Sequence, residues 1–154
     1  MQQTSDRLWL LDTQVRILVS CDDESHGITI IEHEAPFGDS PPLHRHLRED
    51  ESFHVISGTL DIVADGEMKR LGPGQTLRAP KGGSHTYRVV SSDGARFLTI
   101  SGGRDFEQFV RRMGRVPTGP GLPERSGPPS EEAVAELVRI CAEHGIEVVG
   151  PPLT

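Results

Sequence analysis

Residues 59–71 carry the strongest local folding signal in this chain. Two short runs with strand character, TLDIVA and EMKRL, flank the pair Asp65-Gly66. An Asp-Gly pair between two such runs predicts a type I′ turn, and therefore a tight β-hairpin. Seventeen glycines and twelve prolines interrupt many other short apolar runs. This pattern favours an all-β fold with frequent turns over a helical bundle.

Length and charge narrow the class of protein. A chain of 154 residues predicts one domain, residues 1–154, with a core large enough to need no disulfides. The first residues lack a basic leader, and no stretch approaches the roughly 20 apolar residues of a membrane span, so we expect a cytoplasmic protein without a membrane partner. A net charge of −7 without a basic cluster argues against a nucleic acid partner.

Cys21 and Cys141 are not part of any CxxC motif, which favours reduced, buried thiols over a disulfide or a reactive centre.

Two segments concentrate residues that bind metals. In GDSPPLHRHLREDESFHVISG, His44 and His46 are one residue apart, and Glu51 follows after four residues. In a strand, His44 and His46 project from the same face, because side chains alternate with a period of two. The segment GQTLRAPKGGSHTYRV adds His85. Three imidazoles and one carboxylate predict a site for one divalent metal ion per chain.

These two segments resemble the two sequence motifs of the cupin superfamily. The first motif is matched without a gap by Gly38, His44, His46, Glu51 and Gly58, and the second by Gly74, Pro80, Gly82 and His85. Val89 stands where the second motif often has asparagine, a position that is not a ligand in the family. The resemblance implies a small jelly-roll β-barrel with the metal inside. On this basis we expect the barrel over about residues 8–101 and a helical C-terminal extension over about residues 105–154.

The predicted donor set also narrows the choice of metal. Three imidazole nitrogens and one carboxylate oxygen leave about two open positions on a six-coordinate ion. This suits iron(II), manganese, nickel or cobalt better than a closed tetrahedral zinc site, and zinc and copper are the less favoured alternatives. Tyr87 shares a strand face with His85, so we expect it to line the same cavity as a second catalytic candidate beside Glu51. The alternative for Tyr87 is core packing with its hydroxyl hydrogen-bonded.

Three histidines outside the predicted metal site, His26, His33 and His54, are expected not to take part in the chemistry. His26 and His33 lie outside the two motifs, and we expect each at the surface or at the rim of a pocket. If Glu51 points inward, the two-residue period directs His54 outward, to the surface or to a subunit interface.

The two ends of the chain differ in character. Residues 8–20 predict two short strands or one bent strand, and residues 27–35 predict another. Because the edge strands of small jelly rolls need covering, we expect a homodimer that pairs through Trp9 to Val19, as the family resemblance also suggests. Acidic and small residues between Cys21 and Gly27 predict a turn.

After residue 103 the hydrophobic period becomes helical. Apolar residues at helical spacing predict a helix with Asp105 as N-cap and Gly114 at its end, and Ser130 is placed to cap a second helix that ends at Gly145. Proline and glycine predict no regular structure over residues 115–130, and the tail IEVVGPPL is expected to be extended. These helices either pack on the barrel or close its pocket as a lid.

Three classes of function are compatible with this sequence. The first is a dioxygenase for a small phenolic, flavonol-like or enolisable diketone substrate, in which Glu51 is a ligand and, as one option, the base. The second is a redox-neutral cyclase, isomerase or decarboxylase for a polyketide-type substrate, and the third is a non-catalytic cupin that binds a small ligand. The short motif spacing and the helical tail resemble quercetinase-like cupins, which favours the oxygenase, although polyketide-cyclase-like cupins share much of the pattern.

Overall fold

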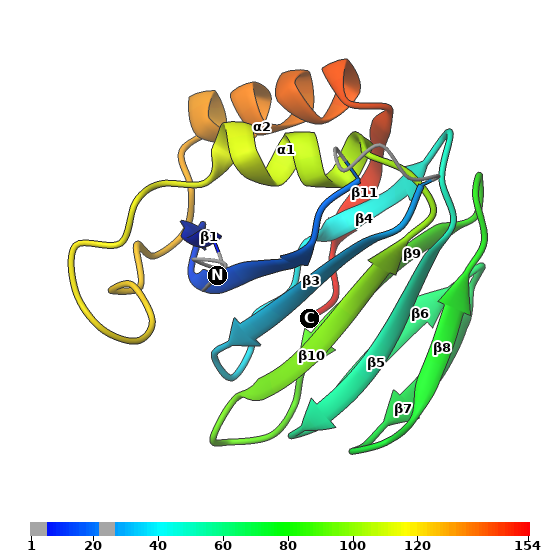
Figure 1. Ribbon diagram of the computed structural model, residues 1–154, viewed down its shortest axis with the longest axis horizontal. Coiled ribbons are helices and arrows are strands. Elements are labelled where there is room, and N and C mark those ends of the chain that lie inside the picture. The colour runs from blue at the N-terminus through cyan, green and yellow to red at the C-terminus, as the bar shows by residue number, and fades with distance from the viewer. Residues whose placement is uncertain (1–5, 22–26) are drawn as a thin grey trace.

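A computed structural model describes residues 6–21 and 27–154 as two antiparallel sheets packed face to face, with two helices at one end (Figure 1). The first sheet has the order β1 (Asp6–Leu10), β2 (Thr13–Val19), β3 (Thr29–Ala35), β10 (Ala95–Ser101), β5 (Glu51–Ser57) and β8 (Thr76–Ala79). The second has the order β11 (Ile146–Pro152), β4 (Pro42–His46), β9 (Ser84–Val89), β6 (Leu60–Ala64) and β7 (Glu67–Leu71). The predicted all-β jelly roll is confirmed. The turn predicted between Cys21 and Gly27 and the placement of His26 fall on residues 22–26, outside the described residues.

The β-hairpin predicted around Asp65-Gly66 is present in the structure. Strands β6 and β7 pair from Leu60↔Leu71 to Ala64↔Glu67. Asp65 and Gly66 have φ values of 50° and 82°, the left-handed conformation that both central residues of a type I′ turn require. At the N-terminus, β1 and β2 are two separate strands, because the chain reverses at Leu11 with a φ of 52°.

The interior of the sandwich follows the two-residue period of its strands. On β5, Glu51, Phe53 and Val55 are buried, whereas His54 points away and lies 2.8 Å from the hydroxyl of Thr76. The predicted outward direction of His54 is therefore confirmed. The main apolar cluster fills the space between the sheets and comprises Ala35, Phe53, Val55, Leu60, Ile62, Leu71, Ala79, Tyr87, Val89, Ala95 and Phe97.

Helices α1 (Asp105–Met113) and α2 (Glu131–Glu143) cover one end of the sandwich (Figure 1). A second apolar cluster joins them to the sheets and comprises Leu10, Val15, Ile17, Ile31, Phe109, Val110, Ile140, Cys141 and Ile146. Ser130 caps α2 as predicted, because its hydroxyl accepts a hydrogen bond from the Ala133 amide at 3.2 Å. The predicted cap of α1 is wrong: Arg104 occupies the N-cap and its side chain makes no capping hydrogen bond, and Asp105 begins the helix. The Asp105 carboxylate is instead engaged by the guanidinium of Arg48.

The C-terminal tail is a strand of the second sheet. Strand β11 pairs with β4 so that Ile146 lies opposite His46 and Val148 opposite His44. The sandwich therefore continues beyond residue 101, and the expected helical extension over residues 105–154 ends in a barrel strand. The extended character of this tail was predicted, but its partner was not, because the pairing joins segments about a hundred residues apart.

The irregular segment between the helices contacts the N-terminal strand. Trp9 and Arg115 exchange two backbone hydrogen bonds of 2.9 Å, and the Trp9 indole donates to the carbonyl of Gly121 at 2.8 Å. The chain itself thus covers part of the β1 edge, and the homodimer expected through this strand stays a proposal.

Cys21 and Cys141 are free and buried, as predicted. Over residues 6–21 and 27–154, neither helix is both long and apolar enough to cross a membrane.

Candidate metal centre

Three strands bring the predicted ligands together inside the sandwich. His44 and His46 lie on β4, Glu51 begins β5, and His85 lies on β9 directly opposite His44. One ligand atom from each of the four residues can be chosen so that all lie within 4.8 Å of one another. His46, Glu51 and His85 are buried, whereas His44 is half-buried. The cluster has the donor types and the compactness that a divalent metal ion needs.

The Glu51 carboxylate contacts two of the three histidines of this cluster. Its Oε2 atom is 2.8 Å from Nε2 of His85 and 3.3 Å from Nε2 of His46. The His46 and His85 rings are stacked, with centroids 5.4 Å apart and planes 7° from parallel. The Nε2 atoms of both rings therefore face the same carboxylate oxygen.

A backbone carbonyl orients the fourth ligand. Nδ1 of His44 lies 2.7 Å from the carbonyl oxygen of Pro42. Because a carbonyl only accepts hydrogen bonds, Nδ1 carries the proton and Nε2 keeps its lone pair. A contact of this kind fixes both the tautomer and the ring orientation of a metal-binding histidine.

The pKa values of His44, His46 and Glu51 are strongly shifted from their ordinary values. Burial and the neighbouring imidazoles of His85 and His46 lower the pKa of His44 to about 4. Burial also opposes the charged form of His46, but the carboxylates of Glu51 and Glu49 outweigh it and raise the pKa of His46 to about 10. Burial alone would raise the pKa of Glu51, yet His46 and His85 hold it well below its usual range. Without a metal, His46 and Glu51 thus form a buried ion pair, and a metal cation would replace the His46 proton.

Buried polar atoms test whether a metal fits this cluster. Among the described residues, Nε2 of His46 is buried without a hydrogen bond, although it lies 3.3 Å from Oε2 of Glu51 as an ion-pair contact. Buried nitrogens without partners are uncommon because losing their hydration costs free energy. A cation at the convergence of Nε2 of His46, Nε2 of His85 and the Glu51 carboxylate would supply the missing interaction. The residues present therefore fit the metal that the sequence predicts.

Tyr87 is part of the apolar core. Its ring packs edge-on against Phe53 and Phe97, and its hydroxyl donates to Oδ2 of Asp39 at 3.0 Å. Burial raises the pKa of Asp39 to about 6, and burial together with Asp39 raises the pKa of Tyr87 well above its usual value. The phenol is thus protonated and hydrogen-bonded, the arrangement expected from core packing. A catalytic role for Tyr87 stays a prediction.

His33 lies in the interior, and its expected placement at the surface or a pocket rim is wrong. The side chain is 4 % exposed, its ring stacks on Phe97 at 4.8 Å, and Nε2 lies 2.9 Å from the Thr99 hydroxyl. Burial lowers the pKa of His33 to about 4, although the nearby charge of Glu51 partly opposes this. The sequence held a usable signal, because His33 shares the two-residue alternation of Ile31 on β3.

The low pKa of His33 predicts acid sensitivity of the metal-free protein. In the unfolded chain His33 takes up a proton near pH 6.5, whereas in the folded protein it does so only near pH 4. The unfolded state therefore binds more protons at His33 in this interval, and the contribution of His33 to the free energy of unfolding should fall as the pH falls from 6.5 to 4. Asp39, whose pKa is raised to about 6, acts in the opposite direction. The full shift of the His33 pKa corresponds to about 3 kcal/mol.

Urea unfolding at several pH values, with a chelator present, measures this dependence. His33→Gln should be less pH-sensitive than the wild type over the same interval, and His44, whose pKa is also lowered to about 4, should account for part of the remainder. Identical slopes in the two proteins would contradict the assignment to His33.

Comparison with known proteins agrees with this architecture. Residues 31–101 match the Cupin domain family. The chain is 29% identical over 109 residues to quercetin 2,3-dioxygenase of Bacillus subtilis. The aligned region covers 71% of this chain but only 32% of that protein. This chain thus spans about a third of the length of that relative.

Solved structures show the same fold. The polyketide cyclase RemF of Streptomyces resistomycificus superposes with a TM-score of 0.54 at 21% identity, covering 66% of this chain and 75% of that one. An RmlC-like cupin of Shewanella frigidimarina superposes with a TM-score of 0.57 at 19% identity, covering 69% and 92%. Likeness at these identities concerns the fold. The family match covers residues 31–101, the part of the chain that carries the four clustered ligands, and the two structural likenesses agree with a cupin fold for this part.

Proposed function

We propose that this protein is a metal-dependent dioxygenase for a small phenolic, flavonol-like or enolisable diketone substrate. The observation that carries the proposal is the buried cluster of His44, His46, Glu51 and His85. The distant similarity to a quercetin 2,3-dioxygenase supports oxygen chemistry over the other uses of such a cluster. We expect iron(II), manganese, nickel or cobalt, because four protein donors leave about two positions free on a six-coordinate ion.

The metal, when bound, supplies Lewis acidity and open positions for a substrate oxygen and for dioxygen. The protein supplies orientation and exclusion of water. The carbonyl oxygen of Pro42 accepts a hydrogen bond from Nδ1 of His44 and so fixes the His44 ring. The buried ring of Phe53 packs edge-on against His85, with ring centroids 5.6 Å apart. His44 is the half-buried member of the cluster, so we infer that a small substrate approaches from its side.

Glu51 has two uses in this mechanism. Its carboxylate balances part of the metal charge, and one of its oxygens could accept a proton from a substrate hydroxyl or an acidic C–H group. Removal of that proton would give an enolate or phenolate, the electron-rich form that reacts with dioxygen. Because Glu51 is buried, the transferred proton would be kept away from bulk water.

Oxygen uptake tests the proposed function. The metal content of the purified protein is measured, and the protein is offered a panel of flavonols, diketones and polyketide-like phenols in an oxygen electrode. We expect uptake with at least one member of the panel, loss of uptake after chelation, and recovery when the metal is restored. Substrate conversion without uptake would refute the oxygenase and support the redox-neutral cyclase, isomerase or decarboxylase. Binding without conversion would support a non-catalytic cupin.

A further inference from the structure

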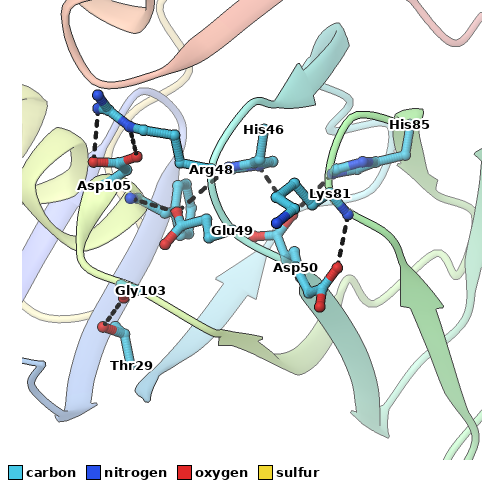
Figure 2. A network of polar contacts seen from close by, with 11 residues as sticks. Thr29, His46, Arg48, Glu49, Asp50, Lys81, His85, Gly103 and Asp105 are labelled. Carbon is cyan, nitrogen blue, oxygen red and sulfur yellow. Dashed lines mark hydrogen bonds and ion pairs between the residues drawn. The ribbon is translucent and has the colours of Figure 1, made fainter. Parts of the chain in front are cut away.

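Glu49 is a buried carboxylate directly behind the metal ligand His46. The side chain of Glu49 is 3 % exposed, and its Oε1 atom lies 3.5 Å from Nδ1 of His46. The same Oε1 atom accepts a hydrogen bond of 2.8 Å from the backbone amide of Phe106, in the first turn of α1. Figure 2 shows Glu49 between His46 and the segment that leads into this helix. One oxygen atom thus lies against both a metal ligand and the start of a helix.

The geometry gives the two nitrogens of His46 different roles. Nε2 lies 3.3 Å from the Glu51 carboxylate and faces the cluster, so Nδ1 is the outer nitrogen. When a neutral imidazole binds a metal through Nε2, its proton resides on Nδ1. A carboxylate beside that proton fixes the tautomer and the orientation of the ring and makes Nε2 a stronger donor.

The surroundings of Glu49 are shaped to hold it in this position. A Cβ atom added at Gly103 would lie 2.7 Å from Oε2 of Glu49 and 3.2 Å from its Cβ, closer than atoms normally pack. Oε2 itself is buried without a hydrogen-bond partner among the described residues. A buried, incompletely paired carboxylate destabilises a protein. Its presence here points to a role beyond stability.

We propose that Glu49 is a positioning residue that holds His46 in its metal-binding tautomer and orientation and anchors that ligand to α1. This inference rests on the metal site of the proposed function and is independent of the oxygen chemistry. It also predicts that the start of α1 is a fixed support for the metal centre and does not move as a lid.

A neighbouring ion pair provides a matched control. Arg48 donates two hydrogen bonds, of 2.7 and 3.0 Å, to the Asp105 carboxylate, so it joins the same loop to the same helix (Figure 2). Its side chain is 64% exposed and its hydrogen bonds and ion pair are with Asp105, whereas the charge of Glu49 acts on it less than Asp105 does. Replacing Arg48 therefore weakens the attachment of α1 without changing the groups that face His46.

Binding of Co²⁺ to the metal-free protein tests the proposal. The dissociation constant is measured by competition with a chelating dye, and the visible absorption spectrum reports the geometry around the ion. Glu49→Gln keeps the size of the side chain and an oxygen acceptor for the Phe106 amide but loses the charge. We expect it to weaken Co²⁺ binding by roughly 10- to 100-fold and to alter the spectrum. Arg48→Ala should leave both unchanged.

Two adjacent glycines give a second test that keeps the Glu49 charge. Gly103→Ala forces the Glu49 side chain to shift, so it should weaken Co²⁺ binding in the same direction as Glu49→Gln. Gly102→Ala is its control, because a Cβ at Gly102 meets no atom of the described residues within 4 Å, apart from its two chain neighbours. This pair decides the question if Glu49→Gln does not fold.

The outcomes separate this inference from the function on which it rests. Wild-type affinity and spectrum in both Glu49→Gln and Gly103→Ala would overturn the role of Glu49. Equal weakening in Arg48→Ala would overturn it as well, because the effect would then arise from the attachment of α1. Failure of the wild-type protein to bind Co²⁺ would instead refute the metal site itself.

Discussion

Replacing His46 or His85 with alanine is expected to reduce the metal content of the purified protein from about one divalent ion per chain to a small fraction of that value. Each substitution removes one of four donors, and it also removes an imidazole whose Nε2 lies within 3.3 Å of the Glu51 carboxylate. The remaining three donors leave an incomplete site, and the buried carboxylate loses a neighbour that stabilises its charge.

Elemental analysis after dialysis against a weak chelator measures this effect and identifies the metal. His54→Ala is the matched control, because His54 lies on β5 only three residues beyond Glu51 but points away from the cluster. It should retain the wild-type metal content. Unchanged metal in both His46→Ala and His85→Ala would exclude the cluster as the binding site, and loss in His54→Ala would show that the assay does not report the site.

Glu51→Gln is expected to retain a substantial share of the metal and yet lose roughly 10²-fold or more in turnover, the usual scale for removing a general base. The amide oxygen of glutamine can still coordinate the ion, but it cannot take a proton from the substrate. The same substitution removes a negative charge that His46 and His85 surround in the folded protein. The net charge of the loaded site therefore rises from +1 to +2.

Turnover per bound metal ion is the decisive quantity, measured with the substrate identified by oxygen uptake. If Glu51 is only a ligand, activity should fall in proportion to metal occupancy and return when metal is added in excess. A turnover per metal close to the wild-type value would exclude the role of base. A variant with full metal occupancy and greatly reduced turnover would support it.

Local sequence patterns sufficed for several features of this protein. The Asp65-Gly66 turn was predictable because only a few residue types adopt positive φ at both central positions of a hairpin. The inward direction of Glu51 and the outward direction of His54 follow from the two-residue period of a strand. The four residues of the cluster were identified by their spacing and by the resemblance to the two cupin motifs, and the structure brings them together.

Other features depend on contacts between distant segments. The pairing of β11 with β4 and the hydrogen bond between Glu49 and the Phe106 amide join residues far apart in the chain. The spacing between His46 and Glu51 marks Glu49 only as an intervening residue, and a carboxylate there would normally be taken as solvent-exposed. Its burial depends on Gly103, which leaves room for its side chain.

The surroundings of His33 and Tyr87 also depend on contacts between distant segments. Sequence periodicity places each of them on the inner face of a strand, but it does not specify what the facing strands present. Thr99 and Phe97 surround His33, and Asp39 accepts the hydroxyl of Tyr87, so each polar group finds its partner inside the sandwich. Periodicity is a property of one segment and can be read locally, whereas burial and hydrogen bonding of a polar side chain depend on which segments pack against it, and only the tertiary structure decides that.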